Sequence, residues 1–181
     1  QPSISADGQT IYFSSDRKGG EGGNDLWKTR RGLSDTWEAP TNLGDDINSP
    51  GNEESPFIHR DQRTLYFRSD GHPGLGSFDL FMSEKIRFQT WTKPVNLGYP
   101  INSIGNDGSL YVSMTGELAY IATDVDKVHS QDYRHQKILD NTDLYEFRLD
   151  PKYRPTPTSY ERYHFVDALS GAALEPQVLL Q

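Results

Sequence analysis

The chain has 181 residues and a formal net charge of −8, because 26 acidic side chains outnumber 18 basic ones. The length suits one domain or slightly more, and the acidic balance argues against nucleic acid or an anionic lipid surface as a partner, since both need a basic face. Cysteine is absent, which excludes disulfides, cysteine metal sites and thiol catalysis, and no run of about 18 apolar residues indicates a transmembrane helix.

Turn residues and aromatic residues dominate the composition. There are 16 Gly and 11 Pro, and aromatic residues make up 12% of the chain. Frequent turns between short apolar runs predict an all-β fold of short strands. Aromatic side chains bury about 150–250 Å² each and therefore supply much of the core. The start at Gln1 shows neither the basic part nor the apolar part of a signal peptide.

The first part of the chain, as far as Glu54, predicts four short strands. Alternation in Ile11-Tyr12-Phe13 places neighbouring side chains on opposite faces. Both faces are apolar, as in a sheet stacked between two similar sheets. A Gly-rich turn, Lys18–Gly23, separates the second strand from the third. The expected strands are Ser3–Ser5, Thr10–Ser14, Asp25–Thr29 and a fourth around Trp37.

The same pattern returns along the chain at a constant interval. Tyr12, Tyr66 and Tyr120 are equally spaced, and the block Trp37–Gly44 returns at the same interval as Trp91–Gly98. Self-similarity at a fixed period indicates repeated structural units. We therefore expect three repeats, at residues 1–54, 55–108 and 109–160. The expected strands of the second repeat are Pro56–His59, Thr64–Arg68, Asp79–Ser83 and a fourth around Trp91.

The third repeat carries an insertion. Asp16 and Asp25 are 9 positions apart, whereas their counterparts Asp124 and Asp143 are 19 apart. The extra segment, Val125–Thr142, is polar and follows the second strand of its repeat. We therefore expect a protruding, mobile loop that holds no metal.

Four short strands repeated about every 40–55 residues are typical of a β-propeller blade. Three blades cannot close a ring, because propellers need about four to eight. We therefore expect consecutive blades in an open or partial propeller, with or without other copies of the chain supplying neighbours. A helix longer than about three turns before Pro151 would contradict this fold, since blades contain only strands and turns.

The residues also resemble a known family. Ile11–Asp16, Gly23–Trp27 and Trp91–Gly98 resemble the WD-like, TolB-type propeller repeat. Asp70–Phe81 resembles the version of this repeat found in OmpA-family envelope proteins. The likeness extends over the three repeats and is weakest in the third, which lacks the tryptophan of the other two. It implies a propeller in a periplasmic protein that is associated with the outer membrane.

The end of the chain predicts a different unit. Pro151, Pro155 and Pro157 indicate a stiff linker. Tyr163–Gln181, which contains a Ser-Gly turn, resembles the first hairpin of a carboxypeptidase-regulatory-like β-sandwich. We therefore expect the start of a second domain over residues 161–181. A hairpin alone is marginally stable in water, so we also expect the chain to be a piece of a longer protein.

Carboxylates that recur in each repeat are the first candidates for chemistry. They form two sets, Asp16, Asp70 and Asp124, and then Asp25, Asp79 and Asp143. Repetition favours a structural role, because a catalytic residue is needed once and a structural one in every blade. We expect these carboxylates to accept hydrogen bonds from turn amides. Ser5-Ala6-Asp7-Gly8 resembles the Asp-box of sialidases, but it lacks one residue of that box, which is itself a structural turn.

The insertion contains a second candidate site. Aspartate and histidine alternate there at steps of three: Asp126, His129, Asp132 and His135. Such side chains can ligate zinc, but the spacing matches no recognised ligand set. A polar, solvated loop is the favoured interpretation.

Glycines and tryptophans also have structural explanations. Gly19–Gly23 lacks the Gly-Lys-Ser/Thr ending of a phosphate loop and carries an acid, so it indicates a hairpin turn. Trp27, Trp37 and Trp91 could be carbohydrate platforms. Their recurrence at equivalent blade positions favours packing instead.

These interpretations predict no catalytic, cofactor-binding or metal-binding residue. We expect a non-catalytic protein-interaction scaffold of the cell envelope. Its partner is expected to contact the loops Arg17–Asn24, His72–Phe78 and Val125–Thr142, because binding residues concentrate on loops held by a rigid scaffold. The net charge favours a protein partner that is basic at its contact face.

The resemblance implies a more specific role, and alternatives stay open. Proteins with this repeat and a regulatory-like sandwich often end in an OmpA-type peptidoglycan-binding domain, as in PorE-type periplasmic lipoproteins of type IX secretion. Peptidoglycan would then be reached only through a domain absent from this chain. One alternative is a glycan-binding or glycan-processing propeller, with exposed aromatics and unpaired carboxylates at the channel mouth. Another is the propeller half of a hydrolase such as the prolyl oligopeptidases, against which residues 167–171 argue because they continue into a sandwich hairpin.

Overall fold

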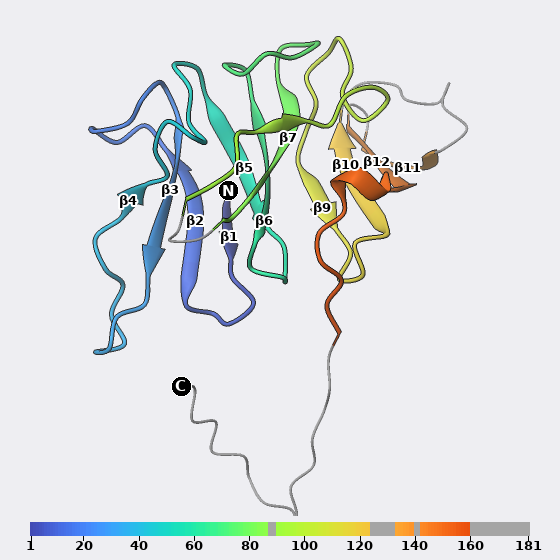
Figure 1. Ribbon diagram of the computed structural model, residues 1–181. Coiled ribbons are helices and arrows are strands. Elements are labelled where there is room, and N and C mark those ends of the chain that lie inside the picture. Colours follow the sequence, from blue (N-terminus) through green and yellow to red (C-terminus); the bar gives the residue numbers. More distant parts are fainter. Residues whose placement is uncertain (87–89, 124–132, 140–141, 160–181) are drawn as a thin grey trace, which may run out of the picture.

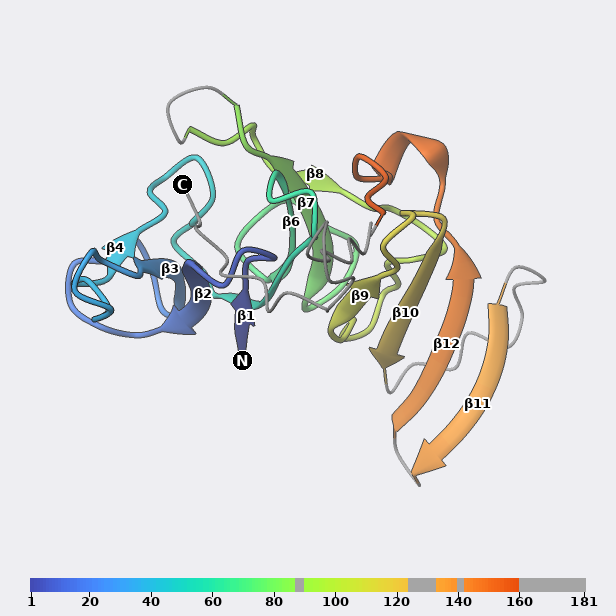
Figure 2. The same ribbon diagram turned by 90° about the horizontal axis from the view of Figure 1, so that it is seen from below.

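The computed structural model describes residues 1–86, 90–123, 133–139 and 142–159. They form three antiparallel four-stranded sheets, which stand side by side in an open arc (Figures 1 and 2). We call these sheets blades one, two and three, in chain order. Within these ranges, no helix has the length and hydropathy needed to span a membrane. The all-β fold of consecutive blades in an open propeller is therefore confirmed.

Blades one and two share one topology, in which each strand pairs with the next in sequence. Blade one contains β1 (Pro2–Ile4), β2 (Thr10–Ser15), β3 (Asp25–Arg30) and β4 (Thr41–Asn42). Blade two contains β5 (Glu53–Ile58), β6 (Thr64–Ser69), β7 (Asp79–Glu84) and β8 (Val95–Asn96). The two central hairpins have the same register, shifted by one repeat.

The fourth strand of each blade is shorter than the sequence suggests, and it lies later. Trp37 and Trp91 each form a single bridge, to Arg31 and Lys85. Pairing resumes only at β4 and β8, which have two residues each. The prediction of a strand around each tryptophan is therefore wrong. A proline follows each tryptophan by three positions, and its missing N–H interrupts the ladder.

Blade three has a different strand order, β11-β12-β10-β9. It contains β9 (Leu110–Val112), β10 (Leu118–Thr123), β11 (Tyr133–Leu139) and β12 (Thr142–Arg148). The insertion supplies β11, so the prediction of a mobile loop is wrong for residues 133–139. The other inserted residues, 125–132 and 140–141, lie outside the described part of the chain. An uncovered sheet edge promotes unwanted pairing, and β11 covers the edge of β12 through pairs such as His135 with Tyr145.

Two hydrophobic cores lie between the blades. One packs Tyr12 and Leu26 of blade one against Leu65 and Phe67 of blade two. The other packs Tyr66 of blade two against blade three. Leu65, Tyr66 and Phe67 are all fully buried. The middle sheet is thus apolar on both faces and stacked between two similar sheets, as the alternation of its sequence predicts.

Position in the arc explains why equivalent tryptophans differ in exposure. Trp91 is 4% exposed and packs edge-on against Tyr12, with ring centroids 6.1 Å apart. Its counterpart Trp37 is 43% exposed, because no described sheet lies on the outer side of blade one. Trp27 is buried beneath the guanidinium of Arg17, which lies 5.2 Å from its ring centroid. The packing prediction holds for Trp27 and Trp91, but not for Trp37.

After β12 the chain turns back over the junction of blades two and three. A short 3₁₀ helix, η2 (Pro151–Tyr153), begins this segment, which is drawn in red in Figure 1. Tyr153 is 8% exposed and joins the core between these blades. The stretch that the sequence predicts to be a stiff linker is therefore packed against the blades, and we call residues 153–158 the docked segment. The sandwich hairpin expected over residues 161–181 lies outside the described residues.

Candidate functional site

Two of the repeated carboxylates anchor the loops that precede them. Asp25 and Asp79 open β3 and β7 and are each 1% exposed. Each accepts two backbone amides of its loop: Asp25 those of Glu21 (2.6 Å) and Gly22 (3.2 Å), and Asp79 those of Leu75 (2.6 Å) and Gly76 (3.1 Å). The predicted structural role is confirmed for both. The side chain of Asp143 lies outside the described part of the structure.

The other repeated carboxylates behave differently from one another. Asp70 accepts the backbone amide of Asn52 (2.6 Å) and its side-chain amide (3.0 Å). Asn52 directly precedes β5, so Asp70 holds the connection between two blades, and not the turn of its own hairpin as predicted. Asp16 is exposed and makes no hydrogen bond to any residue that the structure describes. Asp124 lies outside the described residues.

Buried asparagines hold the outer part of blades one and two to the third strand of each. Asn48 accepts the Leu26 N–H (2.8 Å) and donates to the Leu26 C=O (3.1 Å). Asn102 makes the same two bonds to Leu80, at 2.8 and 2.9 Å. Each asparagine side chain thus makes the two backbone hydrogen bonds that a residue of a neighbouring strand would otherwise make. The sequence signal is the recurrence of Ile-Asn-Ser in the first two repeats, at 47–49 and 101–103, which the sequence alone does not connect to a role.

The turn at Ser5–Gly8 is a scaffold feature. The Asp7 Oδ1 atom accepts the Ser5 hydroxyl (2.5 Å) and the Gln9 amide (2.9 Å). Gly8 has φ of 69°, a conformation that glycine adopts without strain. Asp61 accepts turn amides in the same way in blade two. The resemblance to a sialidase box therefore indicates a turn.

The loops predicted to contact a partner are partly used to join the blades. In the loop between β2 and β3, the Gly23 N–H donates to the Gly51 C=O (2.8 Å). A Cβ on Gly22 would lie 2.4 Å from the carbonyl oxygen of Ser49, so only glycine fits there. The loop between β6 and β7 is tied down similarly through Ser77. Loop tips, such as Leu75 at 53% exposure, remain accessible.

The metal hypothesis concerns residues that the structure describes only in part. Asp126, His129 and Asp132 lie outside the described residues, and for His135 only its place on β11 is described. The prediction that this segment holds no metal stays a prediction. Over the ranges that are described, no group of three His, Asp or Glu side chains could hold a metal ion.

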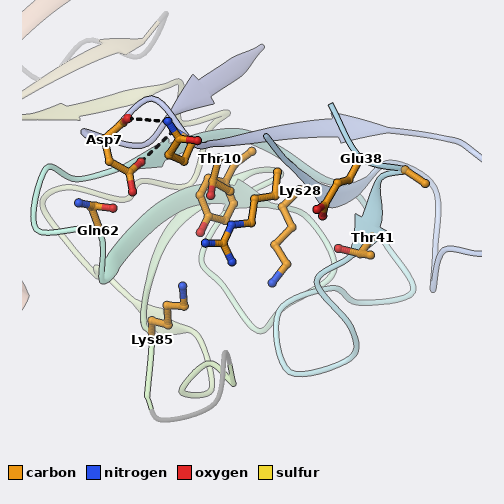
Figure 3. Close-up of a pocket in the computed structure, with 11 residues that line it drawn as sticks. Asp7, Thr10, Lys28, Glu38, Thr41, Gln62 and Lys85 are labelled. Atoms are coloured by element: carbon orange, nitrogen blue, oxygen red, sulfur yellow. Dashed lines mark hydrogen bonds between the residues drawn. The ribbon is translucent and has the colours of Figure 1, made fainter. Parts of the chain in front are cut away.

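A polar cavity of about 330 Å³ lies between blades one and two, where the β1–β2 and β5–β6 turns meet (Figure 3). Side chains from three places line it. The first hairpin of blade one and β3 contribute Asp7, Tyr12, Lys28 and Arg30, the β3–β4 connection contributes Glu38, and blade two contributes Gln62 and Lys85. The cavity joins side chains that are far apart in sequence.

Positive charge is concentrated in this cavity. Burial lowers the pKa of Lys28, and the charges of Lys85 and Arg30 lower it further. Burial alone would raise the pKa of Asp7, but its hydrogen bonds from Ser5 and Gln9, with the charge of Arg30, lower it overall. Cations held close together in a partly dehydrated space attract an anionic group. The cavity is therefore suited to a carboxylate or another anion.

Tyr12 brings an unpaired donor to the cavity. It is 3% exposed, and its hydroxyl makes no hydrogen bond to any part of the chain that the structure describes. Burial, followed by the charge of Asp7, raises the pKa of Tyr12 to about 12. The phenol is therefore protonated at neutral pH. The ring is buried, but the hydroxyl opens onto the cavity, where it can donate to an acceptor.

Asp61, the counterpart of Asp7 in blade two, predicts acid sensitivity. Burial would raise its pKa, but the neighbouring His59 ring and the hydrogen bonds from the amides of Thr64 and Arg63 hold the pKa well below its usual value. Because the pKa of Asp61 is lower in the folded than in the unfolded state, its ionised form stabilises the fold. This stabilisation is fully present above the unfolded pKa, about 3.9, and is lost as the pH falls through the folded pKa. Asp61→Asn should therefore lower the urea midpoint at pH 7, and the gap to the wild type should shrink between pH 5 and pH 2.

The matched control for this measurement is Asp46→Asn. Asp46 is exposed, so this variant should follow the wild type across the whole pH range. A gap between Asp61→Asn and the wild type that stays constant down to pH 2 would contradict the assignment, because the two proteins would then differ in something other than an ionised Asp61.

Comparisons with known proteins identify a fold. No family model matches the sequence, and no curated protein matches it. A solved structure of a protein assigned as TolB from Agrobacterium tumefaciens is similar, with a TM-score of 0.52 and 14% identity over 81% of this chain and 44% of that one. TolB from Acinetobacter baumannii has a TM-score of 0.46 and 13% identity, over 88% of this chain and 32% of that one. The chain spans less than half the length of either structure, and the first likeness shows a TolB-like propeller fold.

Proposed function

We propose that this chain is a non-catalytic protein-interaction module of a cell-envelope protein, located in the periplasm and associated with the outer membrane. The observation that carries the proposal is the use of the repeated carboxylates. Asp25, Asp70 and Asp79 accept backbone amides and so serve the scaffold. Recognition is then left to what differs between the blades, in the manner of repeat proteins.

Two further findings support parts of the proposal. The TolB-like fold supports a propeller, and the resemblance of residues 70–81 to OmpA-family envelope proteins is the basis for the envelope location. A role in type IX secretion, with a link to peptidoglycan through a domain outside this chain, rests on the sequence resemblance to PorE-type lipoproteins. The partner is a protein, and the proposal includes no cofactor.

Photo-cross-linking in living cells tests the proposed function. A photoreactive amino acid replaces Leu75, which is exposed on the loop between β6 and β7. We expect a cross-link to a defined protein in the periplasmic fraction. The same amino acid at Leu33, fully exposed in the β3–β4 connection at the other end of the strands, is the control and should capture less of that protein. Retention of glycan fragments without a protein cross-link would contradict the proposal and favour a glycan-binding propeller.

A further inference from the structure

The junction of blades two and three binds a stretch of the chain itself through backbone hydrogen bonds. Three of them join this junction to the docked segment: from the Tyr66 hydroxyl to the Tyr153 C=O (2.6 Å), from the Thr156 N–H to Asp61 Oδ2 (3.0 Å), and from the Thr158 N–H to the Met114 C=O (3.0 Å). The prolines at 155 and 157 each precede a bonded amide and stand where no N–H is needed. We call this junction the filled groove.

The floor of the filled groove is apolar. The Tyr153 ring lies in one core cluster with Met82 and Leu149. Arg154 continues the segment in an extended conformation, with φ of −78° and ψ of 137°. The filled groove therefore selects an extended chain through backbone bonds and an aromatic side chain through its floor.

The junction of blades one and two repeats the bonding groups one period earlier. Tyr12 corresponds to Tyr66 and Asp7 to Asp61. The Tyr12 hydroxyl and the Asp7 Oδ2 atom make no hydrogen bond to any described residue, whereas their counterparts bind the docked segment. No described part of the chain lies at the equivalent place, where the structure has the 330 Å³ cavity. We call this junction the open groove.

The floor of the open groove is cationic. Lys28 is the cross-strand partner of Tyr12, as Met82 is the cross-strand partner of Tyr66. Lys85 directly follows β7, as Leu149 directly follows β12. The two apolar positions of the filled groove are therefore both lysines in the open groove, and Arg30 stands nearby. Figure 3 shows the Lys28 and Lys85 side chains approaching the same space, with Glu38 farther along the cavity.

We propose that the open groove binds an extended peptide in the register of the docked segment, with an acidic side chain where Tyr153 lies in the filled groove. The Tyr12 hydroxyl donates to a peptide carbonyl, and Asp7 Oδ2 accepts a peptide N–H three residues later. The peptide carboxylate lies between Lys28 and Lys85, away from Glu38. This inference goes beyond the proposed function, because the open groove lies at the end of the strands opposite to Leu75 and adds a second contact.

A synthetic peptide tests the inference. The probe is acetyl-Glu-Gln-Pro-Thr-Pro-Thr-amide, which keeps the prolines and threonines of the docked segment and places glutamate at its first position. Calorimetric titration into the full chain should show binding at least about tenfold tighter than that of the same peptide with lysine first, because like charges across a contact are strongly disfavoured. Binding of the glutamate peptide should weaken as salt is raised.

Two variants locate the site. Lys28→Met with Lys85→Leu gives the open groove the floor of the filled one, so it should lose at least about tenfold in affinity for the glutamate peptide and gain affinity for the peptide with tyrosine first. Tyr12→Phe removes only the hydroxyl and should weaken binding about fivefold, as expected for one hydrogen bond. Urea midpoints close to that of the wild type confirm that both variants are folded.

Several outcomes would overturn the inference. Absence of binding to the wild type at millimolar peptide would do so, as would equal binding by the double variant. Displacement of the peptide by inorganic phosphate at similar concentration would show a simple anion site and overturn the peptide assignment. A failed cross-link at Leu75 together with a positive titration would contradict the proposed function alone, because the titration uses a synthetic ligand at a different place.

Discussion

Replacing Tyr153 by alanine is expected to lower the free energy of unfolding by about 3–5 kcal/mol, the range for removing a large aromatic side chain from a core. The Tyr153 ring is 8% exposed within the core between blades two and three, and its hydroxyl donates to the Asn96 C=O at 3.2 Å. The truncation leaves a cavity in that core. It also removes the ring that holds the docked segment, so the Tyr66 hydroxyl loses its acceptor when the segment departs.

Urea denaturation and amide hydrogen exchange measure this effect. The amides of Thr156 and Thr158 are hydrogen-bonded to blades two and three and should exchange slowly in the wild type and rapidly in Tyr153→Ala. Lys152→Ala is the matched control, because this neighbour is exposed and its ion pair lies at the surface, where such pairs contribute about 0–1 kcal/mol. A Tyr153→Ala protein as stable as Lys152→Ala would show that the packing of this segment on the blades contributes nothing to stability and that the segment acts only as the stiff linker its prolines suggest.

The repeat was predictable because it rests on local patterns. Apolar alternation in each second strand, a Gly-rich turn and a constant repeat period require only the order of residues. These patterns predict four-stranded units, and because there are only three such units they also predict an arc that does not close. Burial on both faces of the middle blade follows from the same alternation, since Leu65, Tyr66 and Phe67 leave no polar face.

The features that were not predicted depend on contacts between distant parts of the chain. β11 is a partial exception, because it pairs with the adjacent β12 as the edge strand of blade three, which the polar composition of the insertion does not indicate. Asn48 is buried because its amide completes the bonding of Leu26, 22 positions earlier. Tyr153 is buried although the prolines around it suggest a linker, because the groove beside Tyr66 accepts it.

The open groove could not be located from the sequence, although one sequence signal points to it. Lys28 and Lys85 belong to different repeats and meet only when two blades pack together. The signal is a difference between equivalent positions of two repeats, because blade one has Lys28 where blade two has Met82. A position that pairs identically in two blades but changes from apolar to charged marks a surface that the scaffold does not need. When a binding site is sought in a repeat protein, such positions are better candidates than strictly repeated residues.

Replacing Asn102 by alanine is expected to lower the free energy of unfolding by about 2–4 kcal/mol, although the change removes little apolar area. Asn102 is fully buried, and its side chain satisfies both the N–H and the C=O of Leu80. It also donates to Asn96 Oδ1 (2.7 Å), which in turn accepts the Gly98 amide (2.7 Å). Truncation leaves the Leu80 N–H buried without a partner, which costs about 1–3 kcal/mol, while the Leu80 C=O keeps only its bond from the Leu97 N–H (3.0 Å).

Asn102→Asp separates this explanation from simple loss of packing. The aspartate keeps the size of the side chain and can still accept the Leu80 N–H, but it has no N–H to give to the Leu80 C=O or to Asn96. A carboxylate would face two oxygen atoms in a buried site, so the urea midpoint should fall at least as far as in Asn102→Ala and recover in part as pH is lowered and the carboxyl is protonated. Asp46→Ala, at an exposed position, should stay within about 0.5 kcal/mol of the wild type. If Asn102→Asp were as stable as the wild type at pH 7, the asparagine would act through its volume, and the same conclusion would apply to Asn48 in blade one.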